Sequence, residues 1–109
     1  MDHTDLTRLI DNNISNTIKY SFSDTTIEIE ILENKDEVTI VFSNKGNSIE
    51  NTSEIFNRFY RESNVRGGFG LGLNIVKYIC DKYDIKIDVK SNENINAFSY
   101  TLKCHTKIT

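Results

Sequence analysis

The residues best suited to chemistry form a glycine-rich segment, GGFGLGL, at residues 67–73. An apolar pattern of helical spacing follows it, so free backbone N–H groups and the helix dipole would favour an anion such as phosphate. Two familiar phosphate motifs do not fit. A Walker A loop needs Gly-Lys-Ser/Thr, and a dinucleotide fingerprint needs a third glycine where Leu73 stands. Alone, the segment indicates either a phosphate loop or a glycine hinge capping a helix.

A second group of polar residues lies along the first segment with helical periodicity. Its members are Asn12, Asn16, Lys19 and Tyr20. At about 100° per residue they fall within an arc of about 80°, beside the apolar stripe. Asparagine is a poor helix former, and the oxygen of Asn16 suits Mg²⁺, while Lys19 would add a charge for phosphate. The alternative is a solvated polar face in a chain rich in asparagine.

The first part of the chain predicts a helix and a hairpin. Apolar residues at helical spacing predict a helix over residues 4–21, with Thr4 or Asp5 as its N-cap. Alternating β-branched and acidic residues predict a half-buried strand over 26–31. A short turn joins it to a second strand over 37–43.

The rest of the chain predicts, in order, a polar stretch, a short helix, a loop, a long helix and two strands. Their bounds are residues 44–52, 53–59, 61–68, 69–83, 86–91 and 98–104. The asparagine-rich sequence NENIN forms the turn between the last two strands. This order predicts an α+β fold, a two-layer sandwich in which helices cover one face of a mixed sheet. We expect a single domain over residues 1–109.

Composition excludes several classes of protein. The 109 residues are 38% hydrophobic and 27% charged, which is typical of a globular domain rather than a disordered chain. A net charge of −3 argues against a nucleic-acid binder. No apolar run approaches the ~20 residues of a membrane helix, so we expect no membrane contact by this domain. Cys80 and Cys104 lack metal-ligand spacing and indicate reduced thiols in a cytoplasmic protein.

Three segments in order resemble the ATP-binding catalytic domain of sensor histidine kinases, within the GHKL ATPase superfamily. LIDNNISNTIKYS at 9–21 is similar to the N box, IFNRFYR at 55–61 to the F box, and GGFGLGLNIVKYI at 67–79 to the second glycine box. The resemblance covers nearly the whole chain, and the F box favours histidine kinases over gyrase-like or chaperone-like relatives. It implies a Bergerat-type sandwich with a mixed, mostly antiparallel sheet.

This resemblance implies ATP and Mg²⁺ as ligands and a role for each N-box residue. Asn16 corresponds to the asparagine that ligates Mg²⁺, with Asn12 one turn earlier as its helper. Lys19 matches a lysine that contacts phosphate, and Tyr20 matches the aromatic residue beside adenine.

The other boxes complete the implied site. Arg61 corresponds to an arginine that faces the phosphates, and Arg66, in a short lid over 62–67, would reach the γ-phosphate. The lid hinge and the cradle for the phosphates are Gly68, Gly70, Leu71 and Gly72. The implied catalytic residues are Asn16, Lys19 and Arg61.

The first glycine box departs from the family pattern Asp-x-Gly-x-Gly-Ile. This sequence offers Asn44, Gly46, Ser48 and Ile49. The oxygen of Asn44 can still accept the amino hydrogen of adenine, but a neutral acceptor in place of a charged one loses about tenfold in affinity. Ser48 in place of glycine costs about 1–2 kcal/mol if that position needs positive φ. Asn13, where the family prefers leucine, is expected at the edge of the core.

Asn12 also changes the expected chemistry. Relatives that hydrolyse ATP or phosphorylate serine carry a glutamate there as a general base, and asparagine cannot accept a proton near neutral pH. Hydrolysis and an anti-sigma type of serine kinase are therefore disfavoured. A histidine acceptor needs no such base, because neutral imidazole is already nucleophilic.

The expected function is that of a kinase domain that donates the γ-phosphate of ATP to a histidine. That histidine would lie on a separate dimerisation and phosphotransfer domain of the same kinase, and a response regulator would be an indirect partner. We expect the chain to be a fragment of a longer kinase, without the strand that precedes the N-box helix, and cytoplasmic, including as the cytoplasmic part of a membrane-bound sensor. The alternative is a degenerate pseudo-kinase that serves as a docking module with weak or no nucleotide binding.

Overall fold

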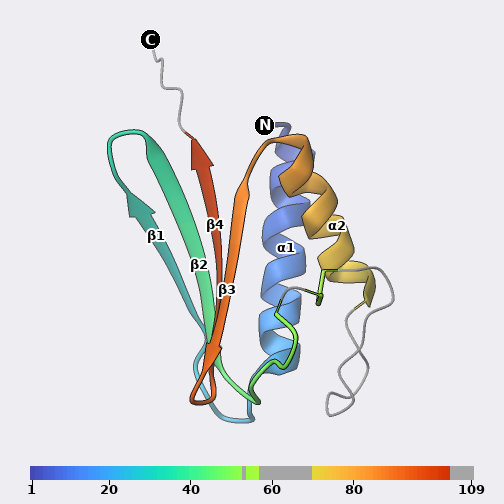
Figure 1. Cartoon of the computed structure of the whole chain (residues 1–109), viewed down its shortest axis with the longest axis vertical. Coiled ribbons are helices and arrows are strands. Elements are labelled where there is room, and N and C mark those ends of the chain that lie inside the picture. Colours follow the sequence, from blue (N-terminus) through green and yellow to red (C-terminus); the bar gives the residue numbers. More distant parts are fainter. Residues whose placement is uncertain (53, 57–69, 104–109) are drawn as a thin grey trace.

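The computed structural model describes residues 1–52, 54–56 and 70–103. The elements are α1 (His3–Tyr20), β1 (Glu28–Glu33), β2 (Glu37–Lys45), α2 (Gly70–Lys82), β3 (Lys86–Asn92) and β4 (Ile95–Lys103). The strands pair in the order β1-β2-β4-β3, and both helices lie on one face of the sheet (Figure 1). The predicted α+β sandwich is confirmed. Every pair among the described strands is antiparallel.

The N-cap of helix α1 lies two residues before Thr4, the earlier of its two expected caps. Asp2 is the N-cap, and its carboxylate accepts a hydrogen bond from the backbone N–H of Thr4 at 3.1 Å. The expectation of Thr4 or Asp5 as the cap was therefore wrong, because both already lie in the first turn. Asp5 points instead toward the end of α2.

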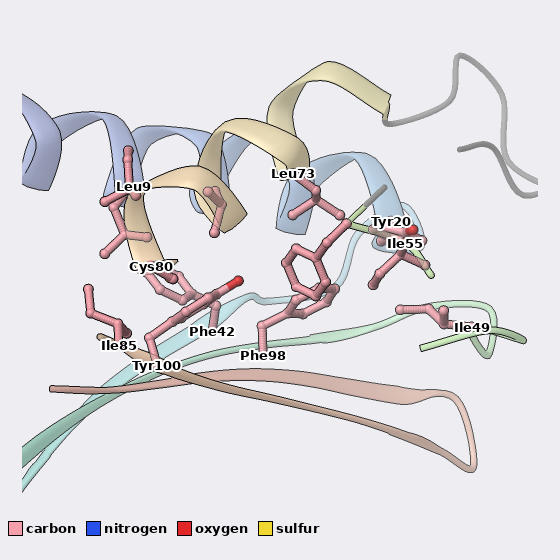
Figure 2. Packing of buried hydrophobic residues seen from close by; sticks show 13 residues of the cluster. Leu9, Tyr20, Phe42, Ile49, Ile55, Leu73, Cys80, Ile85, Phe98 and Tyr100 are labelled. Atoms are coloured by element: carbon pink, nitrogen blue, oxygen red, sulfur yellow. The ribbon is translucent and has the colours of Figure 1, made fainter. Parts of the chain in front are cut away.

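The core lies between the two helices and the sheet (Figure 2). Phe42 of β2 and Tyr100 of β4 pack edge to face, with ring centroids 5.9 Å apart. Leu73, Val76 and Ile79 cover them from α2 and are fully buried. Each such side chain contributes about 1.5–3 kcal/mol when it leaves water.

A hydrogen bond crosses this core between α1 and β4. The Tyr100 hydroxyl donates to Oδ1 of Asn13 at 2.6 Å, and Nδ2 of Asn13 donates to the Leu9 carbonyl at 2.8 Å. Asn13 is 1% exposed, so its expected place at the core edge was wrong. The buried amide is tolerated because both of its polar atoms are bonded.

Replacing Tyr100 with Phe tests this bond. Tyr100→Phe leaves Oδ1 of Asn13 buried without a donor, so we expect the free energy of unfolding to fall by about 1–3 kcal/mol. The matched control is Tyr78→Phe, at a side chain that is 60% exposed, where we expect a change within about 0.5 kcal/mol. Urea denaturation of both variants measures the difference, and equal effects would contradict a stabilising role for the bond.

Strand β1 is more exposed than its alternating pattern indicated. All six of its residues are exposed, and it runs over residues 28–33 rather than 26–31. Ile29 and Ile31 pair with Phe42 and Ile40, and so lie on the helix-facing side of the sheet. The expected half-buried strand was wrong because this edge extends beyond the cover of the helices (Figure 1).

The second hairpin is tighter than expected. Strand β4 starts at Ile95 rather than at residue 98, and the turn consists of Glu93 and Asn94 at φ 51° and 62°. Two successive residues of positive φ are typical of a two-residue hairpin turn that matches the twist of its strands. The short helix expected over 53–59 lies largely outside the described residues, and residues 54–56 form a turn.

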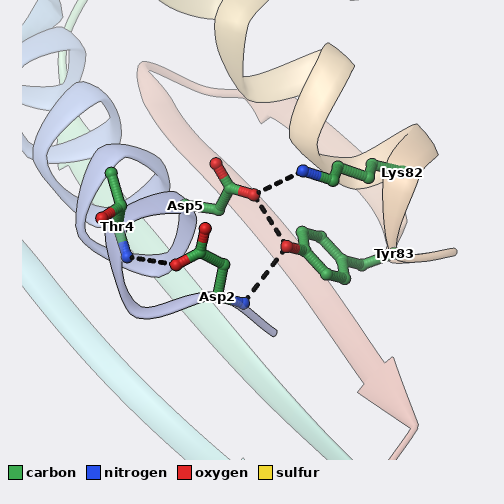
Figure 3. A network of polar contacts seen from close by, with 5 residues as sticks. All are labelled: Asp2, Thr4, Asp5, Lys82 and Tyr83. Atoms are coloured by element: carbon green, nitrogen blue, oxygen red, sulfur yellow. Dashed lines mark hydrogen bonds and ion pairs between the residues drawn. The ribbon is translucent and has the colours of Figure 1, made fainter.

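Asp5 joins the start of α1 to the end of α2 (Figure 3). Its Oδ2 accepts hydrogen bonds from the Tyr83 hydroxyl at 2.7 Å and from the Lys82 ammonium at 3.0 Å. The Tyr83 hydroxyl in turn accepts a hydrogen bond from the Asp2 backbone N–H at 3.1 Å. Hydrogen bonds from Tyr83 and Lys82 hold the pKa of the Asp5 carboxyl below its ordinary value.

This lowered pKa gives the contact a pH dependence. The unfolded chain binds the proton more readily, so the contribution of Asp5 is complete above the unfolded pKa, near 4, and is lost as the pH falls through the folded pKa. Asp5→Asn should therefore be less stable than the wild type at pH 7, and the gap should narrow toward pH 3. Thermal denaturation between pH 7 and 3 measures this difference in stability.

The control is Asp81→Asn, whose exposed ion pair with Lys77 contributes about 0.5 kcal/mol or less. A gap that does not change with pH would contradict this role of the carboxylate.

Candidate functional site

The end of α1 is held against the end of β2. A Cβ atom on Gly46 would lie 2.0 Å from the Tyr20 carbonyl oxygen, so only glycine allows this approach. Ser21 and Gly46 form an isolated antiparallel bridge, and the Phe22 N–H donates to the Lys45 carbonyl at 2.8 Å. The contact brings the last turn of α1 next to the first glycine-box segment.

Two asparagines of α1 have their amide groups oriented by the helix itself. Nδ2 of Asn16 donates to the Asn12 carbonyl at 2.8 Å, and Nδ2 of Asn12 donates to the Arg8 carbonyl at 2.8 Å. Both amide oxygens thus point away from these bonds, and neither accepts a hydrogen bond within the described part of the chain. Asn16 is only 4% exposed. Such an oxygen can serve as a ligand for a hard cation.

The other two residues of this polar group differ in burial. Lys19 is exposed in the last turn of α1, where a cation also suits the helix dipole. Tyr20 is buried, and its ring lies 6.2 Å from that of Phe98. The four predicted residues therefore lie in the C-terminal half of α1, with Tyr20 reaching into the core.

Asn44 stands near the end of β2 with an unsatisfied amide. Its side chain is 3% exposed, and neither Oδ1 nor Nδ2 has a hydrogen-bond partner among residues 1–52, 54–56 and 70–103. Leaving a buried polar group unpaired costs about 1–3 kcal/mol per group. An amide in this state needs a partner from outside the described residues.

The turn between β3 and β4 supports the segment that follows Asn44. The Gly46 N–H donates to the Asn94 carbonyl at 3.0 Å, and Nδ2 of Asn94 donates back to the Gly46 carbonyl at 3.2 Å. Nδ2 of Asn96 donates to the Asn47 carbonyl at 3.1 Å. The turn thus carries the backbone of the candidate site.

Ser91 adds the last support. Its hydroxyl donates to Oδ1 of Asn96 at 2.6 Å and accepts the Ile49 N–H at 2.7 Å. Sequence reasoning missed Ser91, Asn94 and Asn96, and the only available signal was the run of asparagines in NENIN. Their role depends on a contact between segments more than 40 positions apart.

Ser48 does not adopt the positive φ that would strain a serine at this position. The positive-φ residues other than glycine in the described part are Asp24, Asp84, Glu93 and Asn94. Ser48 is exposed, and Ile49 beside it is buried in the core. The cost expected for a serine at positive φ does not arise here.

A cavity of about 620 Å³ adjoins this region. It is lined by Asp24, Thr25, Thr26, Glu28, Ser43, Asn44, Lys45 and Ile95. Asn44 is the only one of the sequence-predicted residues with a described side chain that lines it. The cavity therefore borders the end of β2 at Asn44, and the polar group of α1 does not line it.

The family is decided by comparison with known proteins. A model of the family described as histidine kinase-, DNA gyrase B- and HSP90-like ATPases matches residues 1–107. The chain belongs to this ATPase family.

Similar proteins include several sensor kinases. The chain is 37% identical to the histidine protein kinase SaeS of Staphylococcus aureus over 102 residues, which covers 86% of this chain and 29% of the kinase. It is 35% identical to the sensor protein VanS of Enterococcus faecium over 106 residues, covering 93% of this chain and 28% of that protein. The chain thus spans less than a third of the length of either relative. These matches confirm the resemblance to the ATP-binding domain of sensor histidine kinases.

A solved structure supports the fold. The mycobacterial sensor histidine kinase MprB superimposes with a TM-score of 0.84 at 24% identity, covering 94% of this chain and 74% of that one. Among the described residues of this ATPase domain, no helix is long and apolar enough to cross a membrane.

Part of the predicted site lies outside the described residues of this ATPase domain. Arg61, Arg66 and Gly68 belong to that part, as does the expected lid over 62–67. The backbone of Gly70, Leu71 and Gly72 forms the start of α2, one residue later than expected. The second glycine box therefore opens a helix, as its sequence indicated.

Gly46→Ala tests the contact that assembles the site. The new Cβ would collide with the Tyr20 carbonyl, so the ends of α1 and β2 must separate. We expect the free energy of unfolding to fall by about 1–3 kcal/mol. Ser48→Ala, two residues away and exposed, is the control and should change it by about 0.5 kcal/mol or less. A Gly46→Ala variant as stable as the control, by urea denaturation, would refute the constraint.

Proposed function

We propose that this ATPase domain binds ATP with Mg²⁺ at the joined ends of α1 and β2 and donates the γ-phosphate to a histidine. The observation that carries the proposal is that the Gly46 contact joins the ends of α1 and β2, each of which has a buried asparagine near this contact. Asn16 has an oriented amide oxygen, and Asn44 has an unsatisfied amide. Membership of the ATPase family and the similarity to sensor kinases support it.

The metal would be held by few protein ligands. In the described part of the chain no group of three or more His, Cys, Asp or Glu side chains is placed to hold a metal ion. The oxygen of Asn16, with that of Asn12 one turn earlier, fits Mg²⁺ because this ion takes one or two protein ligands when phosphates supply others. When bound, Mg²⁺ neutralises charge on the phosphates.

The remaining residues would position the nucleotide. Lys19 would contact a phosphate and Tyr20 would pack beside the base, whose amino edge would meet Asn44. The backbone of Gly46, Ser48 and Ile49 would line the base, and Arg61 would face the phosphates. The second glycine box would contribute Gly68, Gly70, Leu71 and Gly72 to the phosphate cradle.

The chemistry of residue 12 favours a histidine as the phosphate acceptor. Asn12 cannot take a proton from water or a hydroxyl near neutral pH. A neutral imidazole already carries a free electron pair and needs no base. The domain would then contribute positioning and charge stabilisation, through Lys19 and Arg61.

The acceptor and the setting belong to the same proposal. The acceptor histidine would lie on a dimerisation and phosphotransfer domain of a longer cytoplasmic or membrane-bound kinase, of which residues 1–109 form one domain. A response regulator would receive the phosphate afterwards. Nucleic acid and membrane would not be direct partners of the domain.

Asn16→Ala tests the metal ligand. We expect it to abolish the Mg²⁺-dependent part of nucleotide binding, because it removes the amide oxygen proposed to ligate the ion. Calorimetric titration with ADP and a non-hydrolysable ATP analogue, with and without Mg²⁺, measures this. Ser15→Ala, on the exposed face of the same helix, is the control and should bind as the wild type does. Unchanged Mg²⁺ dependence in Asn16→Ala would refute the assignment.

The same titration of the wild type bears on the pseudo-kinase alternative. Absence of nucleotide binding with and without Mg²⁺ would favour a docking module. Phosphate transfer to histidine by the intact kinase would eliminate that alternative.

A further inference from the structure

Three buried asparagines of this domain differ in how their amides are satisfied. Asn13 bonds through both polar atoms, to Tyr100 and Leu9. Asn96 is 0% exposed and also uses both atoms, with Ser91 and Asn47. Asn44, the cross-strand neighbour of Asn96, uses neither within the described residues. Of these three asparagines, only Asn44 has an amide without a hydrogen-bond partner among the described residues.

No hydrogen bond within the described residues fixes the orientation of the Asn44 amide. No described neighbour bonds Oδ1 or Nδ2, so a half-turn about χ2 breaks no hydrogen bond. In one orientation a ligand meets the acceptor first, and in the other it meets the donor first. A carboxylate at this position would offer acceptors only.

Adenine and the purines with a carbonyl at the six position present these groups in opposite order. Adenine has an amino donor beside a ring-nitrogen acceptor, whereas guanine and hypoxanthine have a carbonyl acceptor beside a ring N–H donor. An amide that can take either orientation matches either order. A carboxylate matches the amino group of adenine and has no hydrogen to offer the carbonyl.

We propose that Asn44 gives the nucleotide site a relaxed purine specificity, so that it takes nucleotides with a carbonyl at the six position as well as adenine nucleotides. This inference rests on the proposed nucleotide site and names its specificity-determining residue. The aspartate of the family pattern would make the site selective for adenine.

The test compares the dissociation constants of ADP and IDP in the presence of Mg²⁺. These nucleotides differ only at the edge that Asn44 would meet, and GDP adds one amino group at the two position. For the wild type we expect IDP to bind within about tenfold of ADP, since each purine finds one donor and one acceptor. ADP binding with IDP weaker by more than about thirtyfold would overturn the inference and leave the proposed function intact.

Asn44→Asp is the decisive variant. It should tighten ADP and weaken IDP, so that the IDP to ADP ratio rises by about tenfold or more. An unchanged ratio would overturn the inference. Ser43→Ala, the neighbouring position on β2, is the control and should leave both constants as in the wild type.

If Asn44→Asp does not fold, Asn44→Ala decides, because it should weaken ADP and IDP alike. Loss of ADP alone would contradict the inference, and absence of ADP binding by the wild type would overturn the proposed function together with it.

Discussion

The close approach of Gly46 to the Tyr20 carbonyl is the constraint on which the rest of the candidate site depends. Because a Cβ would lie 2.0 Å from that oxygen, the end of α1 and the end of β2 can meet only where residue 46 is glycine. Asn16 lies one turn before this contact and Asn44 two residues before it. Residues far apart in the sequence therefore share one end of the sandwich for a steric reason.

Helix α1 is attached to the rest of the fold along its whole length. Asp5 bonds to Lys82 and Tyr83 at its start, Asn13 bonds to Tyr100 in its middle, and Tyr20 contacts Gly46 at its end. Three attachments at different heights prevent the helix from sliding or rotating on the sheet. The polar group of α1 is thus positioned in advance, which lowers the cost of binding a ligand.

Local patterns predicted the helices well and the hairpins less well. The helices expected over 4–21 and 69–83 lie at His3–Tyr20 and Gly70–Lys82. Such helices can be predicted locally because the spacing of their apolar residues depends on the geometry of one element alone. The alternation over 26–31 predicted a strand with two faces, but could not show that Ile29 and Ile31 lie beyond the cover of the two described helices (Figure 1). In the site, the box patterns indicated Asn16 and Asn44. They could not indicate Ser91 or Asn96, whose role exists only once β3 and β4 meet the segment at 46–49.

Asparagine shows why burial and bonding must be considered together. In sequence, Asn13, Asn16, Asn44 and Asn96 belong to one asparagine-rich composition, and a polar face would explain them as well as a site. All four are buried, so burial alone does not separate them either. Their bonds do: Asn13 and Asn96 use both amide atoms, Asn16 uses its nitrogen, and Asn44 uses neither among the described residues. Under the proposed function, a bound nucleotide would supply the partner that the buried amide of Asn44 lacks among the described residues, and Mg²⁺ would meet the unused oxygen of Asn16.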